Sequence, residues 1–191
     1  MRPVLQNGRR RADRVRVGSR SRVESGAGFA TMKGVAHRDG DGFVVCRCGR
    51  PHWGLHGAAG LLLVRIDLDE PHVLLQLRAG WTHDGGTWAL PGGAMDSHED
   101  PATAAIRESH EEAGVDSALV EIKDIFVDDH GTWSYSTVIA HTHGDAAAHE
   151  ANGESAEVRW VPVQSVAAYD LHPGLAASWP SLLPRIVTSL A

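Results

Sequence analysis

The sequence has almost no cysteine, no long apolar run and no internal repeat. Cys46 and Cys48 are the only cysteines among 191 residues, and their near-adjacent positions are a poor geometry for a mutual disulfide. No window approaches the roughly 20 consecutive apolar residues of a membrane helix, and the N-terminus lacks the apolar stretch of a secretory signal. These absences predict a cytoplasmic protein with no membrane span and no disulfide framework.

Charge is divided unevenly along the chain, which carries a net charge of −6 at pH 7. Residues 1–31 contain eight arginines and two acidic residues, a net charge of +6, so residues 32–191 carry −12. The length suits one domain of ordinary size with an appendage.

Residues 1–41 are rich in arginine, glycine and serine and show no sustained hydrophobic periodicity. Such a segment cannot bury enough apolar area to offset the entropy lost on ordering. We therefore predict a disordered N-terminal tail over 1–41 and a folded domain over 42–191. A solvated tail is favoured over a nucleic-acid-binding arm and an organelle transit peptide, because no aromatic residue is interleaved with the arginines before Phe29.

Short apolar runs separated by turn residues begin at residue 42 and predict strands. They lie at 43–46, 60–66, 73–77, 88–90, 121–127, 133–140 and 158–163. Asp129-His130-Gly131 predicts a hairpin turn. A strong helix is predicted at 101–113, with weaker helical segments near 164–169 and 175–189. Strands on both sides of one central helix indicate an α/β domain with a mixed sheet.

The helix predicted at 101–113 carries three clustered glutamates, Glu108, Glu111 and Glu112. Its ends are marked by residues typical of an N-cap, a first helical position and a left-handed C-terminal position, namely Asp100, Pro101 and Gly114. Like charges three and four residues apart repel by a few tenths of a kcal/mol, so helix stability does not explain the cluster. Carboxylate oxygens favour Mg²⁺ or Mn²⁺, and these ions in turn favour phosphate-bearing substrates.

A stripe of mostly small residues on the same helix is predicted to face the sheet. At about 100° per residue, its members are Ala102, Ala105, Ile106, Ser109 and Ala113. The glutamates fall in a neighbouring sector of the helix, away from the centre of this stripe.

Beginning at Gly93, the chain reads Gly, five residues, Glu99, seven residues and then Arg107-Glu108-Ser109-His110-Glu111-Glu112-Ala113-Gly114-Val115. This resembles the Nudix box of the Nudix hydrolase superfamily, G-x5-E-x7-R-E-U-x-E-E-x-G-U, at every charged and glycine position. Ser109 departs from the bulky aliphatic residue usual at its position. The resemblance implies a Nudix fold, an α/β/α sandwich with a mixed β-sheet, over 42–191.

The resemblance also implies a metal site for Mg²⁺ or Mn²⁺. The implied ligands are the carboxylates of Glu108, Glu111 and Glu112, the backbone carbonyl of Gly92, and Glu154 from outside the box. Such metals neutralise phosphoanhydride oxygens and activate water.

Catalytic roles are implied for Glu108, Glu111, Glu154 and Arg107. Either box glutamate, Glu108 or Glu111, is a candidate general base, and Glu154, with Glu157 as its competitor, is the candidate from outside the box. Arg107 and Glu99 are expected to form an ion pair that holds the loop against the helix.

Substrate-binding positions implied by the resemblance are Arg78, Trp81 and His172. The pattern is most similar to bacterial MutT-type members, which convert 8-oxo-dGTP to the monophosphate and pyrophosphate. His172 stands where purine selectivity in such members uses an amide, and Trp133 is a second candidate for base stacking.

Two other functions remain open beside a MutT-type (8-oxo-)dGTP or NTP pyrophosphohydrolase. One is hydrolysis of ADP-ribose or another nucleotide conjugate, and the other is a Nudix-fold sensor whose basic tail binds nucleic acid. Homodimer formation also remains open.

The remaining metal-ligating side chains fall in Cys46-x-Cys48-x3-His52-x3-His56. These residue types suit a tetrahedral zinc site, but the Cys-x-Cys spacing is tighter than usual, and the sequence favours no zinc. His141 and His143 are predicted to be surface residues.

Overall fold

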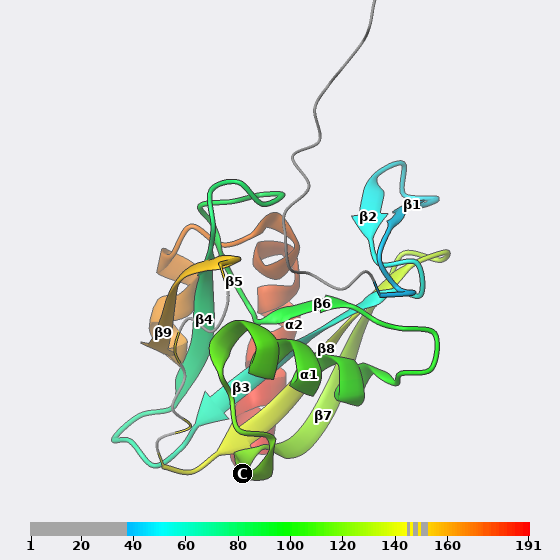
Figure 1. The fold of residues 1–191 in the computed structure, drawn as a ribbon. Helices are drawn as coiled ribbons and strands as arrows, with labels where there is room; N and C mark the ends of the chain where they lie inside the picture. The colour runs from blue at the N-terminus through cyan, green and yellow to red at the C-terminus, as the bar shows by residue number, and fades with distance from the viewer. Residues whose placement is uncertain (1–37, 145, 147–148, 150–152) are drawn as a thin grey trace, which may run out of the picture. The chain divides into compact units, whose positions relative to one another are not determined.

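The structure, a computed structural model, describes residues 38–144, 146, 149 and 153–191, so most of the predicted tail lies outside the described residues. Its centre is a seven-stranded sheet (Figure 1). The strands are β3 (Ala58–Arg65), β4 (His72–Arg78), β5 (Trp88–Ala89), β6 (Gly92–Ala94), β7 (Glu121–Asp129), β8 (Ser134–Thr142) and β9 (Ser155–Pro162).

The sheet is mixed, as the sequence predicts. Its main path runs β5-β4-β3-β8-β7, while β6 pairs with β3 and β9 pairs with β4. Strands β3 and β8 are parallel, from Ala58 opposite Tyr135 to Arg65 opposite Thr142. The remaining pairs are antiparallel. Long-range pairing of β3 with β8 and β4 with β9 thus brings both halves of the chain into one sheet.

Helix α1 (Pro101–Ala113) and helix α2 (Pro173–Ser189) cover opposite faces of this sheet (Figure 1). Two short 3-10 helices, η1 (Ser117–Leu119) and η2 (Val163–Ala168), complete the helical segments of the described residues. The α/β/α sandwich predicted from the sequence is confirmed. Within the described residues, no helix is long and apolar enough to cross a membrane.

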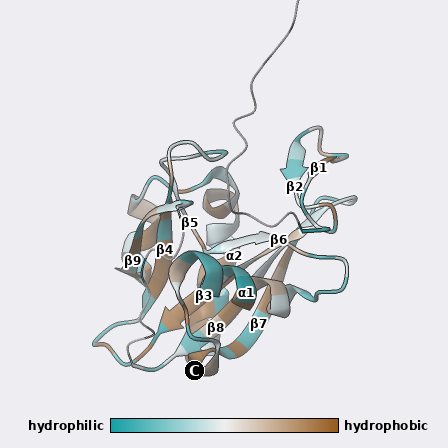
Figure 2. Cartoon of the chain, in the orientation of Figure 1, coloured by the Kyte–Doolittle hydropathy of each residue, from teal (hydrophilic) through white to brown (hydrophobic). Residues whose placement is uncertain are grey.

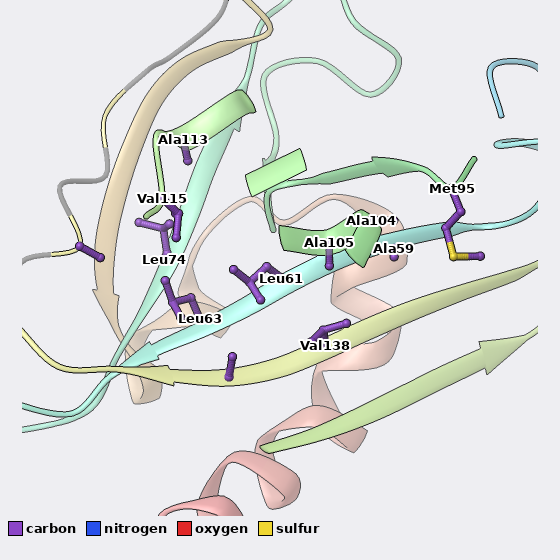
Figure 3. Close-up of a cluster of buried hydrophobic side chains, with 12 residues drawn as sticks. Ala59, Leu61, Leu63, Leu74, Met95, Ala104, Ala105, Ala113, Val115 and Val138 are labelled. Atoms are coloured by element: carbon purple, nitrogen blue, oxygen red, sulfur yellow. The ribbon is translucent and has the colours of Figure 1, made fainter. Parts of the chain in front are cut away.

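The two cores are filled by alternate residues of the same strands, because successive side chains of a strand point to opposite faces. On the α1 side, Leu61 and Leu63 join Leu74 and the helix residues Ala104 and Ala105 (Figure 3). On the α2 side the neighbouring strand residues meet the aromatic and aliphatic face of that helix, namely Leu62, Val64, Val73, Leu75, Trp179, Leu182 and Ile186. The central strands are accordingly the hydrophobic part of the ribbon (Figure 2). Each fully buried Leu contributes about 1.5–3 kcal/mol.

A second, two-stranded sheet consists of β1 (Phe43–Val45) and β2 (Pro51–Trp53). Phe43 lies opposite Trp53, and the outer two residues of each three-residue strand are exposed. Strands β2 and β6 are absent from the sequence-based prediction because neither contains an apolar run.

The prediction of a surface position is wrong for His141, which is only 3% exposed. Strand β8 extends to Thr142 in the centre of the sheet, so His141 lies under the end of α2. Its Nε2 is 2.9 Å from Oγ of Ser189. His143, just past the strand, is exposed as predicted.

Candidate active site

Helix α1 begins and ends at the residues that the sequence indicates. Oδ1 of Asp100 accepts the Thr103 amide at 2.8 Å, and Pro101 opens the first turn. Gly114 ends the helix with a left-handed φ of 63°, and its amide donates to the His110 carbonyl at 3.0 Å. The helix register, and with it the position of every glutamate, is therefore fixed at both ends.

The buried face of α1 differs from the predicted stripe. Its buried residues are Ala104, Ala105, Ser109, Glu112 and Ala113. Two members of the predicted stripe, Ala102 and Ile106, are only partly buried. The helix is rotated so that Glu112, expected beside the stripe, is only 4% exposed.

Glu112 is buried because β4 and β6 present hydrogen-bond donors to it. Its Oε2 accepts the side-chain amide of Gln76 and the backbone amide of Gly92, each at 2.8 Å. Burial raises the pKa of Glu112 to about 8, and the negative charges of Glu108 and Glu154 act in the same direction. Two neutral donors therefore do not fully compensate the burial of this charge.

Glu108 and Glu111 lie one helical turn apart and share a cationic neighbour, Arg107. The Nη1 of Arg107 is 2.5 Å from Oε1 of Glu108 and 3.7 Å from Oε2 of Glu111. Burial raises the pKa of Glu108 despite this arginine. Glu111 is more exposed, and the Nη2 of Arg38 lies 2.6 Å from its Oε1.

Arg107 makes a bidentate ion pair with Glu99. Its Nε and Nη2 lie 2.7 Å from Oε1 and Oε2 of that carboxylate. Arg107 also donates to the Ala94 carbonyl at 3.0 Å, while Glu99 accepts the Asp96 amide at 3.0 Å. Hydrogen bonds from Arg107 lower the pKa of Glu99. This two-pronged pairing holds the loop after β6 against the helix.

Two glycines allow backbone to approach the carboxylates closely. A Cβ on Gly93 would lie 2.7 Å from the carboxyl carbon of Glu108, and one on Gly92 would lie 2.5 Å from the Ala59 carbonyl oxygen. A side chain at either position would displace a site residue or the β3–β6 pairing.

Glu154 precedes β9 at the same edge of the site. Its carbonyl accepts the Ala79 amide at 2.8 Å, and its charge contributes to the raised pKa of Glu112. The neighbouring Ser155 donates to Oε1 of Gln76 at 2.5 Å. Glu157 instead accepts Nε of Arg159 at 2.8 Å on the strand surface. Of the two outside glutamates, the structure places Glu154 next to Glu112.

The expected substrate-binding residues lie in and around the β4–β5 loop. Nε of Arg78 donates to the His83 carbonyl at 3.1 Å, and Trp81 is 56% exposed. His172 caps α2, since its Nδ1 accepts the Gly174 amide at 3.1 Å, and its Nε2 lies 3.3 Å from Oδ2 of Asp84. Burial and the charge of Arg78 lower the pKa of His172. His172 is therefore a neutral capping residue close to Arg78.

Trp133 is engaged away from the carboxylates. Its ring stacks on His52 with centroids 4.2 Å apart, and its Nε1 donates to the Trp53 carbonyl at 3.1 Å. The structure gives no support to base stacking by Trp133.

Sequence reasoning missed Gln76 and Arg38. Gln76 is an amide in the middle of the apolar run Val73 to Leu77, and a buried polar group of this kind requires a partner, so the sequence did contain a signal. Arg38 falls in the predicted tail, where nothing distinguishes it from the other arginines. It pairs with Asp96 at 3.2 Å as well as with Glu111.

The donor set fits a hard divalent cation. Glu108, Glu111 and Glu112 offer carboxylate oxygens from one helix, and burial raises the pKa of two of them. Oxygen ligands of this kind are those that Mg²⁺ and Mn²⁺ prefer. A cation would offset the charge repulsion that the protein's own donors leave.

Such a helix, packed on a mixed sheet with a glycine-rich strand beside its carboxylates, defines a hydrolase that handles phosphate-bearing substrates with divalent metals. The family model described as NUDIX domain matches residues 54–182. The chain therefore belongs to the Nudix hydrolase family, whose members act on nucleotide substrates.

Its relatives include a protein of Mycobacterium tuberculosis named "Putative 8-oxo-dGTP diphosphatase 3", which is 50% identical over 151 residues, 75% of this chain and 69% of that protein. A nucleoside triphosphate pyrophosphatase/Nudix hydrolase fusion protein of Bifidobacterium longum is 42% identical, over 78% of this chain and 32% of its own length. Among solved structures, the Nudix hydrolase RenU of M. smegmatis is 46% identical with a TM-score of 0.73, covering 78% of this chain and 96% of RenU.

Proposed function

We propose that this protein is a Mg²⁺-dependent pyrophosphohydrolase of 8-oxo-dGTP and related nucleoside triphosphates, releasing the monophosphate and pyrophosphate. The observation that carries the proposal is the carboxylate site, Glu108, Glu111 and Glu112, with Glu112 buried against Gln76 and the Gly92 amide. Support for the purine substrate comes from the M. tuberculosis relative, whose name specifies that nucleotide.

The residues that would hold Mg²⁺ lie on α1 and at the neighbouring strand ends. Both donors to Glu112 bind its Oε2, which leaves Oε1 available as a ligand. Glu108 and Glu111 would supply further carboxylate oxygens, Gly92 its carbonyl, and Glu154 a carboxylate from the turn before β9. When bound, the ion neutralises phosphate oxygens and lowers the pKa of coordinated water.

Side chains of the protein carry out the proton transfer and hold the reacting groups in position. A water oxygen bonds to one phosphorus of the α–β bridge, the bridging P–O bond breaks, and Glu108 takes the proton of the water. Burial raises the pKa of Glu108, which brings the carboxylate closer to the basicity that a general base needs near neutral pH. Arg107 holds this carboxylate at 2.5 Å, and Glu99 fixes Arg107 in turn.

Arg78 is the phosphate-binding residue of the proposal. Its Nε is occupied by the His83 carbonyl, so the opposite end of the guanidinium is presented to the triphosphate. Trp81, exposed on the same loop, supplies a face for the base, and His172 holds the loop through Asp84.

A panel of 8-oxo-dGTP, dGTP, CTP, ADP-ribose and dinucleoside polyphosphates, assayed with Mg²⁺, tests the proposal. We expect the highest kcat/KM for 8-oxo-dGTP, with monophosphate and pyrophosphate as products. In ¹⁸O-labelled water, the labelled product identifies which phosphorus is attacked. A preference for ADP-ribose, or release of orthophosphate, would contradict the assignment.

A matched pair of variants distinguishes the activity of this protein from that of a contaminating enzyme. Glu108→Gln removes the proposed base, whereas Glu121→Gln makes the same change on an exposed glutamate of β7 that pairs with Lys123. We expect the first to lose turnover and the second to retain it. Equal turnover in both variants would contradict the role of Glu108.

A further inference from the structure

Four side chains with sulfur or nitrogen ligand atoms lie close together outside the carboxylate site. They lie near the N-terminal end of β3, away from the turn that joins β3 to β4. Cys46 and Cys48 lie in the turn between β1 and β2, His52 lies on β2, and His130 lies in the turn between β7 and β8. Their ligand atoms all lie within 4.8 Å of one another. We call these residues the Cys/His cluster.

The cluster is close to the size that a tetrahedral ion requires. With Zn–S near 2.3 Å and Zn–N near 2.0–2.1 Å, ligand atoms in such a site stand roughly 3.3–3.8 Å apart. Sγ of Cys48 is 3.1 Å from Nε2 of His52, and the limit of 4.8 Å on the other ligand-atom separations exceeds that of a tetrahedral shell by about 1 Å. The side chains would therefore move closer together on binding an ion.

The turn that carries the cysteines holds the sulfur of Cys46 among polar groups, and the Cys46 thiol donates to the His130 carbonyl at 3.2 Å. The Gly49 amide donates to the Cys46 carbonyl at 2.9 Å, and Gly49 has a left-handed φ of 84°. The Cys48 amide lies 3.5 Å from Sγ of Cys46, and the Thr132 hydroxyl donates to the same sulfur at 3.6 Å. These contacts hold the sulfur of Cys46 in place beside the β7–β8 turn.

Both histidines are oriented by neighbours. The His52 ring stacks on Trp133 at an interplanar angle of 10°. Nε2 of His130 lies 3.3 Å from Oδ2 of Asp128, a distance at which one ring nitrogen faces a carboxylate and leaves the other for a metal. Carboxylate partners of this kind commonly support metal-ligating histidines.

The β1–β2 hairpin has few stabilising contacts of its own. Strands β1 and β2 have three residues each and form their own two-stranded sheet, and isolated two-stranded hairpins are at best marginally stable in water. Val45 is 84% exposed and Phe43 is 56% exposed, so the hairpin buries little apolar surface. Single hydrogen bonds and ring contacts already join this hairpin to the β7–β8 turn, among them Trp133 Nε1 to the Trp53 carbonyl, and an ion shared by the two segments would strengthen that junction.

We propose that Cys46, Cys48, His52 and His130 bind one structural Zn²⁺ ion that ties the β1–β2 hairpin to the β7–β8 turn. All four ligands come from the protein, as in closed structural sites, whereas catalytic zinc keeps an open position. The fourth ligand of the proposed site is His130 and not His56, the last residue of the sequence motif. His56 is exposed and lies outside the cluster.

Co²⁺ added to the reduced, metal-free full chain tests the proposal directly. Cys46 and Cys48 are the only cysteines, so thiolate-to-cobalt charge-transfer absorption reports this site and not the carboxylates. We expect the absorption to saturate at one Co²⁺ per chain and to vanish when Zn²⁺ is added. Absence of this absorption with excess Co²⁺ would overturn the proposal, independently of any variant.

Matched variants identify the ligands. Cys48→Ser changes an exposed residue, and His130→Ala removes the ligand from the distant turn. Both should weaken Co²⁺ binding at least tenfold, whereas His56→Ala should bind Co²⁺ as the parent protein does. Circular dichroism establishes that each variant is folded. The assignment fails if folded His130→Ala keeps full affinity or if His56→Ala loses it.

Discussion

The carboxylate site and the Cys/His cluster both bring potential metal ligands together, but from differently arranged parts of the chain. Glu108, Glu111 and Glu112 come from a single helix, where the 3.6-residue repeat sets their relative positions. The Cys/His cluster draws on three segments from two separate sheets, and contacts between those sheets, such as that of Cys46 with the His130 carbonyl, bring the ligands together. Ligands on one helix leave a readable spacing in the sequence, whereas ligands from separate sheets leave only their residue types.

The two sites also differ in how they treat charge. Burial raises the pKa of Glu108 and Glu112 on the helix, while donated hydrogen bonds lower the pKa of Cys46 in the cluster. The first arrangement holds anions that need a cation, and the second prepares a thiolate before any cation arrives. Substitutions made in one site at a time test whether metal binding and activity in the two sites are independent.

Glu111→Gln is expected to have the largest effect on activity. The substitution removes the negative charge of a proposed metal ligand, a carboxylate that also pairs with Arg38 and Arg107. We expect kcat/KM to fall by more than about 100-fold, because the loss of a residue that only supports a metal ligand typically costs about 10- to 100-fold. Steady-state kinetics with Mg²⁺ measures the loss. Co²⁺–thiolate absorption should not change; a loss of both signals would mean that the two sites are coupled.

Gln76→Leu should weaken the Mg²⁺ affinity by about 10- to 100-fold. The amide positions Oε2 of Glu112 and is itself held by Ser155, so its loss leaves the buried carboxylate without a side-chain donor. The Mg²⁺ dependence of turnover gives the affinity. Gln164→Leu, on η2, is the matched control, and an equal effect there would refute the positioning role.

The contribution of Glu112 to the stability of the metal-free protein should fall as pH rises from about 5 to 8. The folded pKa of Glu112, about 8, lies above its ordinary value of 4.5. Its contribution is therefore fully present below pH 4.5 and is lost as pH rises through the folded value. We expect this contribution to fall by about 1–3 kcal/mol, measured as the difference between the parent protein and Glu112→Gln in urea denaturation with EDTA. Glu112→Gln should flatten this dependence, and an unchanged slope would contradict it.

Cys48→Ser should have the smallest effect on activity, changing kcat by less than about twofold, because the residue is exposed and makes no contact with the carboxylates. The same variant should bind Co²⁺ at least tenfold more weakly, as described above. A large loss of kcat at saturating Mg²⁺ would show that the Cys/His cluster supports catalysis.

Much of the fold was predictable because its strongest signals are local. The apolar runs gave β3 and β4, and the residues Asp100 and Gly114 gave both ends of α1. Strands β2 and β6 were not predictable, since three residues with little apolar character acquire strand geometry only from their partners.

The sequence predicted the carboxylates of the candidate active site but not the neighbouring residues that hold them in position. Helix periodicity placed Glu112 outside the apolar stripe. The residue is nevertheless buried, because Gln76 and the Gly92 amide donate hydrogen bonds to its carboxylate. Arg38 reaches Glu111 across the fold, and no local pattern indicates such a contact. The sequence motif of metal-ligating residues contains His56 and not His130, because contacts between distant segments leave no spacing in a motif.

The pairing of β3 with β8 and of β4 with β9 sets an order of assembly during synthesis. Helix α1 leaves the ribosome before β7, β8 and β9 exist, so Leu61 has no Val138 and Leu74 has no Trp160 beside it. Pairings between distant segments form slowly, because the intervening loop must close first. A nascent chain that ends after α1 thus holds all three box glutamates, yet Gln76 gains Ser155 only when β9 has been translated.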